Sequence, residues 1–101
     1  MVRIIAKRTL RQFWERSPRY RDAQGPLEAW YTEARHATWQ TPADVKTQYH
    51  NASVFRDGRM VFNIAGNKYR LVVRIRYDTQ TIFVRFVGTH ADYDTIDAQM
   101  I

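Results

Sequence analysis

A row of alternating cations marks the stretch between Asn67 and Tyr77. It consists of Lys68, Arg70, Arg74 and Arg76, with apolar or aromatic residues between them. Side chains of a β-strand point alternately to opposite faces, so this spacing places the four cations on one surface. Only Val72 interrupts the row. A solvated outer face is the ordinary explanation of such a row, and a surface that binds a polyanion is its alternative.

Residues near this row favour the second explanation, a surface that binds a polyanion. Asn63 and Arg85 lie in the segments before and after it, and antiparallel neighbours place facing side chains about 5 Å apart. They would join the cations if the strand registers agree, which the sequence does not fix. His90 falls where a strand passes into a short helix, a place where backbone N–H groups attract anions. Tyr93 and Asp94 follow it by three and four residues, on the same helix face.

Together these groups suit the cleavage of RNA without a metal. The 2′-OH must lose a proton, the phosphorane must be stabilised and the 5′-oxygen must gain a proton. Histidine changes its charge near neutral pH, so His90 could transfer these protons, as could Lys68, typically for a rate gain of about 10² to 10⁴. Arg70 and Arg85 could contact the phosphorane, and Tyr93 could stack on a base or orient the 2′-OH. The candidates for binding the rest of the RNA are Asn63, Asn67, Arg74 and Arg76.

Each candidate also has an ordinary structural interpretation. His90 could cap a helix, Tyr93 could pack against the fold, and Arg76 could be a solvated charge beside a turn. A non-catalytic module that binds RNA or other nucleic acid would use the same surface. So would an interaction protein that docks an acidic partner. Cleavage with a 2′,3′-cyclic phosphate product separates the enzyme from both alternatives.

Composition narrows the class of partner. The chain has 101 residues, a formal net charge of +6 and a pI of about 10.1, which favours an anionic partner. It has no cysteine and no apolar run long enough for a signal peptide or a membrane span, which predicts a soluble cytoplasmic protein. Zinc-binding HExxH, P-loop and GxSxG motifs are absent, so we expect no metal and no cofactor.

The expected elements are a strand, three helices, three strands and a last short helix. The helices are expected at 7–16, from 25 onward and at 42–49, and the strands at 2–6, 59–65, 67–77 and 81–89. Thr41 is expected to cap the helix at 42–49, with proline at its first position, and Thr89 is expected to cap the last helix, with Asp92 as its third residue. This order predicts an α+β fold: a small antiparallel sheet with helices packed on one face.

Two of these elements carry specific expectations. Leu27, Trp30, Tyr31 and Ala34 recur at helical spacing, which predicts a buried stripe. The last strand is expected to alternate regularly. That alternation puts Phe83, Arg85 and Val87 on one face and Ile82, Val84 and Phe86 on the other.

Two segments resemble the HigB family of type II toxin–antitoxin toxins. They are VFNIAGNKYRLVV at 61–73 and FVRFVGTHADYD at 83–94, and LEAWY at 27–31 and Trp39 also resemble the family. The resemblance implies that residues 1–101 form a single RelE-like toxin domain. It further implies an mRNA endoribonuclease that cuts messages on translating ribosomes and leaves 2′,3′-cyclic phosphate and 5′-OH ends.

The same resemblance implies a partner and a division of roles. The partner is a HigA-type antitoxin with a helix-turn-helix domain, and operator DNA is bound only through the complex with it. The segment from Thr89 to Asp94 is similar to that of RelE-like toxins with a late histidine near the active site. We therefore expect proton transfer by His90, phosphate contacts from Arg70 and Arg85, assistance from Lys68 and substrate positioning by Tyr93.

Overall fold

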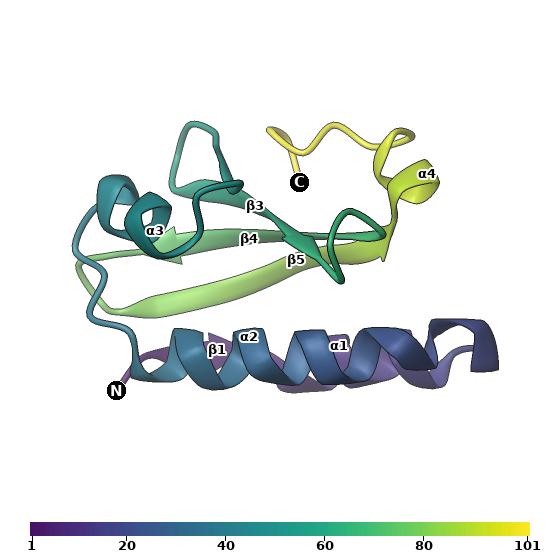
Figure 1. Cartoon of the computed structure of the whole chain (residues 1–101). Coiled ribbons are helices and arrows are strands. Elements are labelled where there is room, and N and C mark those ends of the chain that lie inside the picture. The colour runs from purple at the N-terminus through teal and green to yellow at the C-terminus, as the bar shows by residue number, and fades with distance from the viewer.

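A five-stranded sheet with the order β1-β5-β4-β3-β2 lies at the centre of the computed structural model, which describes residues 1–101 (Figure 1). The strands are β1 (Arg3–Ile5), β2 (Ser53–Val54), β3 (Arg59–Ile64), β4 (Tyr69–Arg76) and β5 (Thr81–Thr89). β3, β4 and β5 form the expected antiparallel meander, to which β2 adds an antiparallel edge strand. β1 pairs with β5 in parallel, so the sheet is mixed. The predicted α+β class is confirmed.

Helices α1 and α2 cover one face of the sheet (Figure 1). The helices are α1 (Lys7–Glu15), the 3₁₀ helix η1 (Pro18–Ala23), α2 (Gln24–His36), α3 (Pro42–Gln48) and α4 (His90–Tyr93). η1 was not expected from the sequence. Its cap is Ser17, whose hydroxyl accepts a hydrogen bond from the Arg19 N–H, and proline at its first position preorganises the backbone. No helix of the fold combines the length and the apolar character that crossing a membrane requires.

The main core fills the space between these helices and the sheet. The predicted stripe on α2 is buried at Leu27, Trp30 and Ala34, whereas Tyr31 is only half-buried. Along β4 the apolar face runs from Tyr69 to Ile75 and is almost completely buried. Burying this face against α1 and α2 fixes which side of β4 faces the helices, and so sends the alternate residues, the cations, to the other side.

Phe62 on β3 joins α3 and the segment before it to this core. Its ring centroid lies 5.4 Å from that of Trp30, 6.4 Å from that of Trp39 and 5.1 Å from that of Tyr49. Such aromatic contacts add to the burial of apolar area. They hold α3, whose Thr41 capping box was predicted, against one end of the sheet.

A β-bulge interrupts the last strand at Arg85. Val72 pairs with Phe86 and Val73 pairs with Val84, so Arg85 has no partner on β4. The expected regular alternation of β5 is therefore wrong beyond this residue. Val84 and Val87 both pack toward the main core, and Phe86 packs with Val72 on the opposite face. An extra residue in one strand shifts the alternation by one position, as observed here.

Residues 95–101 form a strap across the face opposite α1 and α2, where the end of the chain crosses the sheet in yellow (Figure 1). Ala98 is buried against Val61 and Val72 in a second, smaller apolar cluster. The Arg59 side chain donates a hydrogen bond from Nε to the backbone oxygen of Ile101 at 2.7 Å. The strap explains why the cation row contains a valine, because Val72 lies beneath it.

Candidate active site

The junction between β5 and α4 is fixed by a capping box. The Asp92 N–H donates to the Thr89 hydroxyl at 3.1 Å, and the Thr89 N–H donates to the Asp92 carboxylate at 3.2 Å. This confirms the predicted cap. α4 is a single turn, and the Asp92 carboxylate already lies at its N-terminal end. The anion site expected at this helix end is therefore not formed, and binding must rely on side chains.

His90, the first residue of α4, forms an ion-pair contact with Asp94 one turn later. Its Nδ1 lies 3.3 Å from Asp94 Oδ2, and both side chains are at least half exposed. A carboxylate at Nδ1 holds the ring in one orientation and favours the tautomer that carries its proton there. The Nε2 atom then remains available to a substrate.

Arg70 lies beside this junction. Its position on β4 pairs with Asn63 on one side and with Gly88 on the other. Its guanidinium donates to the Asn67 side chain at 2.7 Å and lies 5.8 Å from the centre of the Tyr93 ring. The structure therefore brings together four predicted residues, Asn63, Asn67, Arg70 and Tyr93, next to the helix that carries His90.

Lys68 is held from the opposite side by Asp22 of η1. The Asp22 carboxylate accepts hydrogen bonds from the Lys68 ammonium and from the buried Tyr69 hydroxyl. The bond to Asp22 raises the pKa of Lys68 above its ordinary value, and the bonds from Lys68 and then Tyr69 lower the pKa of Asp22. Lys68 is therefore kept as a cation. Asp22 was missed by sequence reasoning because it lies 46 residues away and belongs to no motif.

An open hollow of about 390 Å³ lies between η1 and this junction. We call it the η1 hollow; its lining residues are Arg19, Tyr20, Lys68, Tyr69, Thr89, His90 and Ala91. Two predicted catalytic residues, Lys68 and His90, thus face a common space. Arg19 and Tyr20 were not among the residues predicted for the site.

The other predicted cations lie apart from this group. Arg74 lies four residues farther along β4 than Arg70, which corresponds to about 13 Å of extended chain. The strap crosses β4 between them, at Val72. Arg74 donates to the Asp57 backbone oxygen at 3.0 Å, and Arg76 pairs with the Asp78 carboxylate at 3.3 Å.

Arg85 is exposed on the bulge, and its side chain makes no hydrogen bond or ion pair within the chain. The six polar residues expected to share one surface are therefore divided, because the registers gather Asn63 and Arg70 but leave Arg74 and Arg76 at the far end of the sheet.

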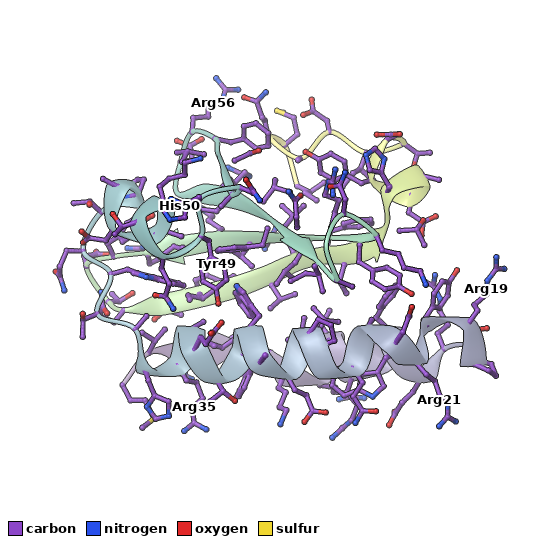
Figure 2. All side chains as sticks on the ribbon, in the orientation of Figure 1. Arg19, Arg21, Arg35, Tyr49, His50 and Arg56 are labelled. Carbon is purple, nitrogen blue, oxygen red and sulfur yellow. The ribbon has the colours of Figure 1, made fainter.

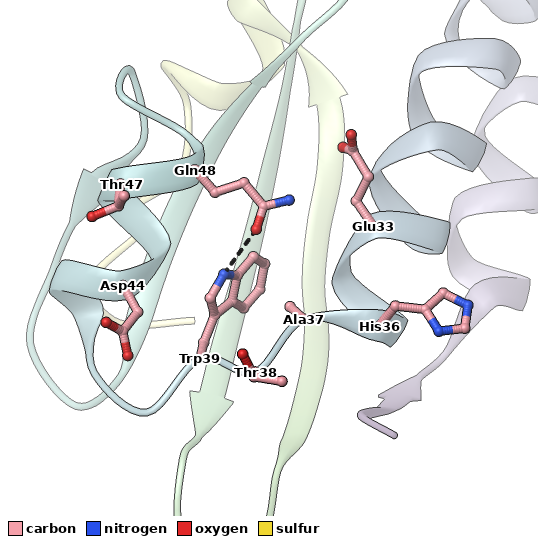
Figure 3. Close-up of a pocket in the computed structure, with 8 residues that line it drawn as sticks. All are labelled: Glu33, His36, Ala37, Thr38, Trp39, Asp44, Thr47 and Gln48. Atoms are coloured by element: carbon pink, nitrogen blue, oxygen red, sulfur yellow. Dashed lines mark hydrogen bonds between the residues drawn. The ribbon is translucent and has the colours of Figure 1, made fainter.

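A second hollow, of about 590 Å³, lies between the end of α2 and α3 (Figure 3). Trp39 lies within it and donates from its indole to Gln48 at 3.1 Å. Its carboxylates already have structural partners, since Asp44 accepts from two backbone N–H groups and Glu33 from the Tyr49 hydroxyl. It contains none of the predicted site residues. No three His, Cys, Asp or Glu side chains of the chain are grouped so that they could hold a metal ion.

Comparison with known proteins points to one family. The model of the HigB_toxin family, described as the RelE-like toxic component of a toxin–antitoxin system, matches residues 23–96. The mRNA interferase toxin HigB of Escherichia coli (strain K12) is 25% identical over 99 residues, covering 96% of this chain and 92% of that protein. The mRNA interferase HigB of Escherichia coli O6:H1 is 26% identical over 86 residues, covering 83% of this chain and 84% of that protein. The matched range includes every predicted site residue and excludes Arg19, Tyr20 and Asp22.

Proposed function

The chain belongs to the HigB family of RelE-like toxins, and from that premise we propose that it is an mRNA endoribonuclease that acts on the translating ribosome and inhibits translation. Its relatives carry the name mRNA interferase. The observation that carries the proposal is the arrangement of His90, Lys68 and Arg70 around the β5–α4 junction. Lys68 and His90 line one hollow, and Arg70 lies against Tyr93 of the same short helix as His90, so one proton-transfer group and two cations flank this junction.

We infer that cleavage proceeds by attack of the 2′-oxygen on the adjacent phosphorus. The bond to the 5′-oxygen breaks, which leaves a 2′,3′-cyclic phosphate and a 5′-OH. His90 transfers a proton at one of the two oxygens through Nε2, while Asp94 stabilises the ring at Nδ1. Lys68, held protonated by Asp22, stabilises negative charge on the phosphorane rather than accepting a proton. Lys68 is therefore assigned the stabilisation of charge only, although a lysine could also have transferred a proton.

Arg70 provides the planar fork that suits two phosphate oxygens. Its bond to Asn67 and its contact with Tyr93 limit where the guanidinium can lie. Tyr93 and Asn63 position the substrate beside it. Arg85 is free to reach the same phosphate, because no group of the chain binds its side chain. Arg74 and Arg76 contact RNA farther from the bond that is cleaved.

We infer a HigA-type antitoxin as the partner, since the family description is that of one component of a toxin–antitoxin pair. Operator DNA is then bound only by the complex, through the helix-turn-helix domain of the antitoxin. A net charge of +6 supports association with both an acidic protein segment and RNA.

The test is induction of the chain in a bacterial host without an antitoxin, with growth recorded and mRNA 5′ ends mapped. His90→Ala is the variant, and His50→Ala is its matched control, because His50 is exposed on the loop after α3, away from the β5–α4 junction (Figure 2). We expect arrest and translation-dependent cuts in the wild type and in His50→Ala, and neither in His90→Ala. Cuts that persist without translation would contradict dependence on the ribosome.

The second candidate function is a non-catalytic module that binds RNA with the same basic surface. The exposed Arg74 and Arg76 on β4, which lie apart from the β5–α4 junction, are what favours it, because binding alone requires cations and no proton transfer. A folded wild-type product that causes no arrest and no new 5′ ends, yet binds RNA with strong salt dependence, would establish this alternative instead.

A further inference from the structure

His90 lines the η1 hollow, and Tyr93 is not among its lining residues. We propose that this hollow binds one nucleotide of single-stranded RNA adjacent to the cleaved phosphate, with Arg19 and Tyr20 as its recognition residues. The proposal rests on the proposed function for the identity of the ligand. It adds a subsite formed by Arg19 and Tyr20 of η1, which lie outside the range that the family model matches.

The size and lining of the hollow suit a nucleotide. Its volume of about 390 Å³ falls within the range of small-ligand sites, roughly 300 to 1,000 Å³. Tyr20, Tyr69 and Ala91 provide apolar lining for a base. Arg19 and Lys68 provide cations for a phosphate beside His90. Single-stranded nucleic acid is bound by this combination of aromatic surface and positive charge.

Tyr20 is held in place before any ligand binds. Its ring stacks on Phe13 with centroids 4.8 Å apart and meets Tyr69 edge to face at 6.3 Å. Arg16 and Arg19 place their guanidinium carbons 5.3 Å and 5.8 Å from the same ring centre. A guanidinium supported by an aromatic ring presents a second flat surface, on which a base can stack.

Arg19 and Arg21 of η1 point in different directions. Figure 2 shows Arg19 on the side of η1 toward the sheet and α4, whereas Arg21 points away from the sheet. Arg19 lines the hollow and Arg21 does not. Both are exposed arginines of one short helix, so Arg21 provides a matched control for charge and helix context.

The strap covers part of the sheet on the other side of the β5–α4 junction. Toward the middle of β4, the surface beyond Arg70 is covered where Ala98 is buried against Val72. An RNA strand that passes His90 cannot lie against the sheet there while the strap is in place. The η1 hollow, by contrast, is lined by His90 itself and by no residue of the strap.

The test measures the affinity of the full-length chain for oligoadenylates of two to six nucleotides whose 2′-OH groups are replaced by hydrogen, so that they cannot be cleaved by 2′-OH attack. We expect one added nucleotide to increase the affinity of the wild type and of Arg21→Ala by about tenfold. In Arg19→Ala this step should disappear. The slope of log affinity against log salt should also fall by about 0.7, the change expected for one lost phosphate contact on a single strand.

Two results would overturn the subsite: no step with length in the wild type, or a step of full size in Arg19→Ala. A parallel cleavage assay with His90→Ala separates this failure from failure of the proposed function. If the wild type cleaves and His90→Ala does not, while Arg19→Ala keeps the full length step, only the subsite is wrong. If the wild type cleaves nothing but shows the step, the binding subsite stands and the catalytic proposal fails.

Discussion

Replacing Gly88 by alanine tests how the sheet positions α4. Gly88 is buried on β5, opposite Arg70 and two residues before His90. A Cβ there would lie 2.6 Å from the Phe86 Cζ, 3.1 Å from the Asp92 Cβ and 3.2 Å from the Asp92 carboxylate. The methyl group therefore meets both the ring beside the bulge and the residue that caps α4.

The size of the destabilisation follows from the overlap between the added Cβ and the Phe86 ring. An ordinary contact to the Phe86 ring needs about 3.4 Å, so the ring must retreat by roughly 0.8 Å or the α4 turn must move. Overpacking of this kind costs about 1 to 3 kcal/mol. For a chain of this length, that corresponds to a fall in Tm of roughly 5 to 15 °C. Movement of Asp92 would also loosen the capping box and shift His90, so cleavage should slow even where the variant is folded.

Gly25→Ala is the matched control. Gly25 lies in the first turn of α2, and a Cβ there would meet nothing within 4 Å. Two opposing effects act here: alanine loses less backbone entropy on folding than glycine, but its Cβ crowds the ring of the following Pro26, so stability should change by less than about 1 kcal/mol. Urea unfolding of both variants measures the two effects, and cleavage assays below both transitions measure activity.

Gly88→Ala should therefore destabilise the chain clearly more than Gly25→Ala, and only Gly88→Ala should slow cleavage. A Gly88→Ala variant as stable and as active as the wild type would refute the reasoning. It would mean that the β5–α4 junction adjusts freely and does not position His90.

Three other substitutions have definite expected results. Asp94→Asn should lower kcat by about 10- to 100-fold with KM little changed, because it weakens the support of the His90 ring; rapid-quench cleavage measures both constants. Asp22→Asn should lower Tm at neutral pH, and the difference should close as the pH falls through the lowered pKa of Asp22, because its interaction with Lys68 requires the ionised carboxylate. A difference that is the same at every pH would show that the charge is irrelevant. Val72→Ala should cost about 2 kcal/mol in urea unfolding and make the strap more sensitive to protease; an unchanged cleavage pattern would show that the strap does not depend on this contact.

The sequence predicted those parts of the fold that depend on local patterns. The stripe of Leu27, Trp30 and Ala34, the three-stranded meander and the capping boxes at Thr41 and Thr89 are all present. Each is specified within a few residues, by helical period, by alternation with turns, or by a hydroxyl and a carboxylate three residues apart.

The bulge at Arg85 and the parallel pairing of β1 depend on how separate segments meet. The run from Ile82 to Val87 is apolar on both faces apart from Arg85, so either alternation was compatible with it. The contact of Asp22 with Lys68 could not be predicted for the same reason. No local sequence pattern around Asp22 indicates a contact with Lys68. Val72 was the one available signal, because a valine within a row of cations indicates a place that another segment covers.

The central claim is that the chain cleaves RNA by 2′-OH attack with His90 in the site. The most direct measurement is the chemistry of the ends that the purified chain produces on programmed ribosomes, with Arg70→Ala and His90→Ala beside the wild type. The account predicts 5′-OH and 2′,3′-cyclic phosphate ends in the wild type, loss of cleavage in both variants, and antitoxin binding retained by both. Ends carrying a 5′-phosphate, or full cleavage by His90→Ala, would contradict it.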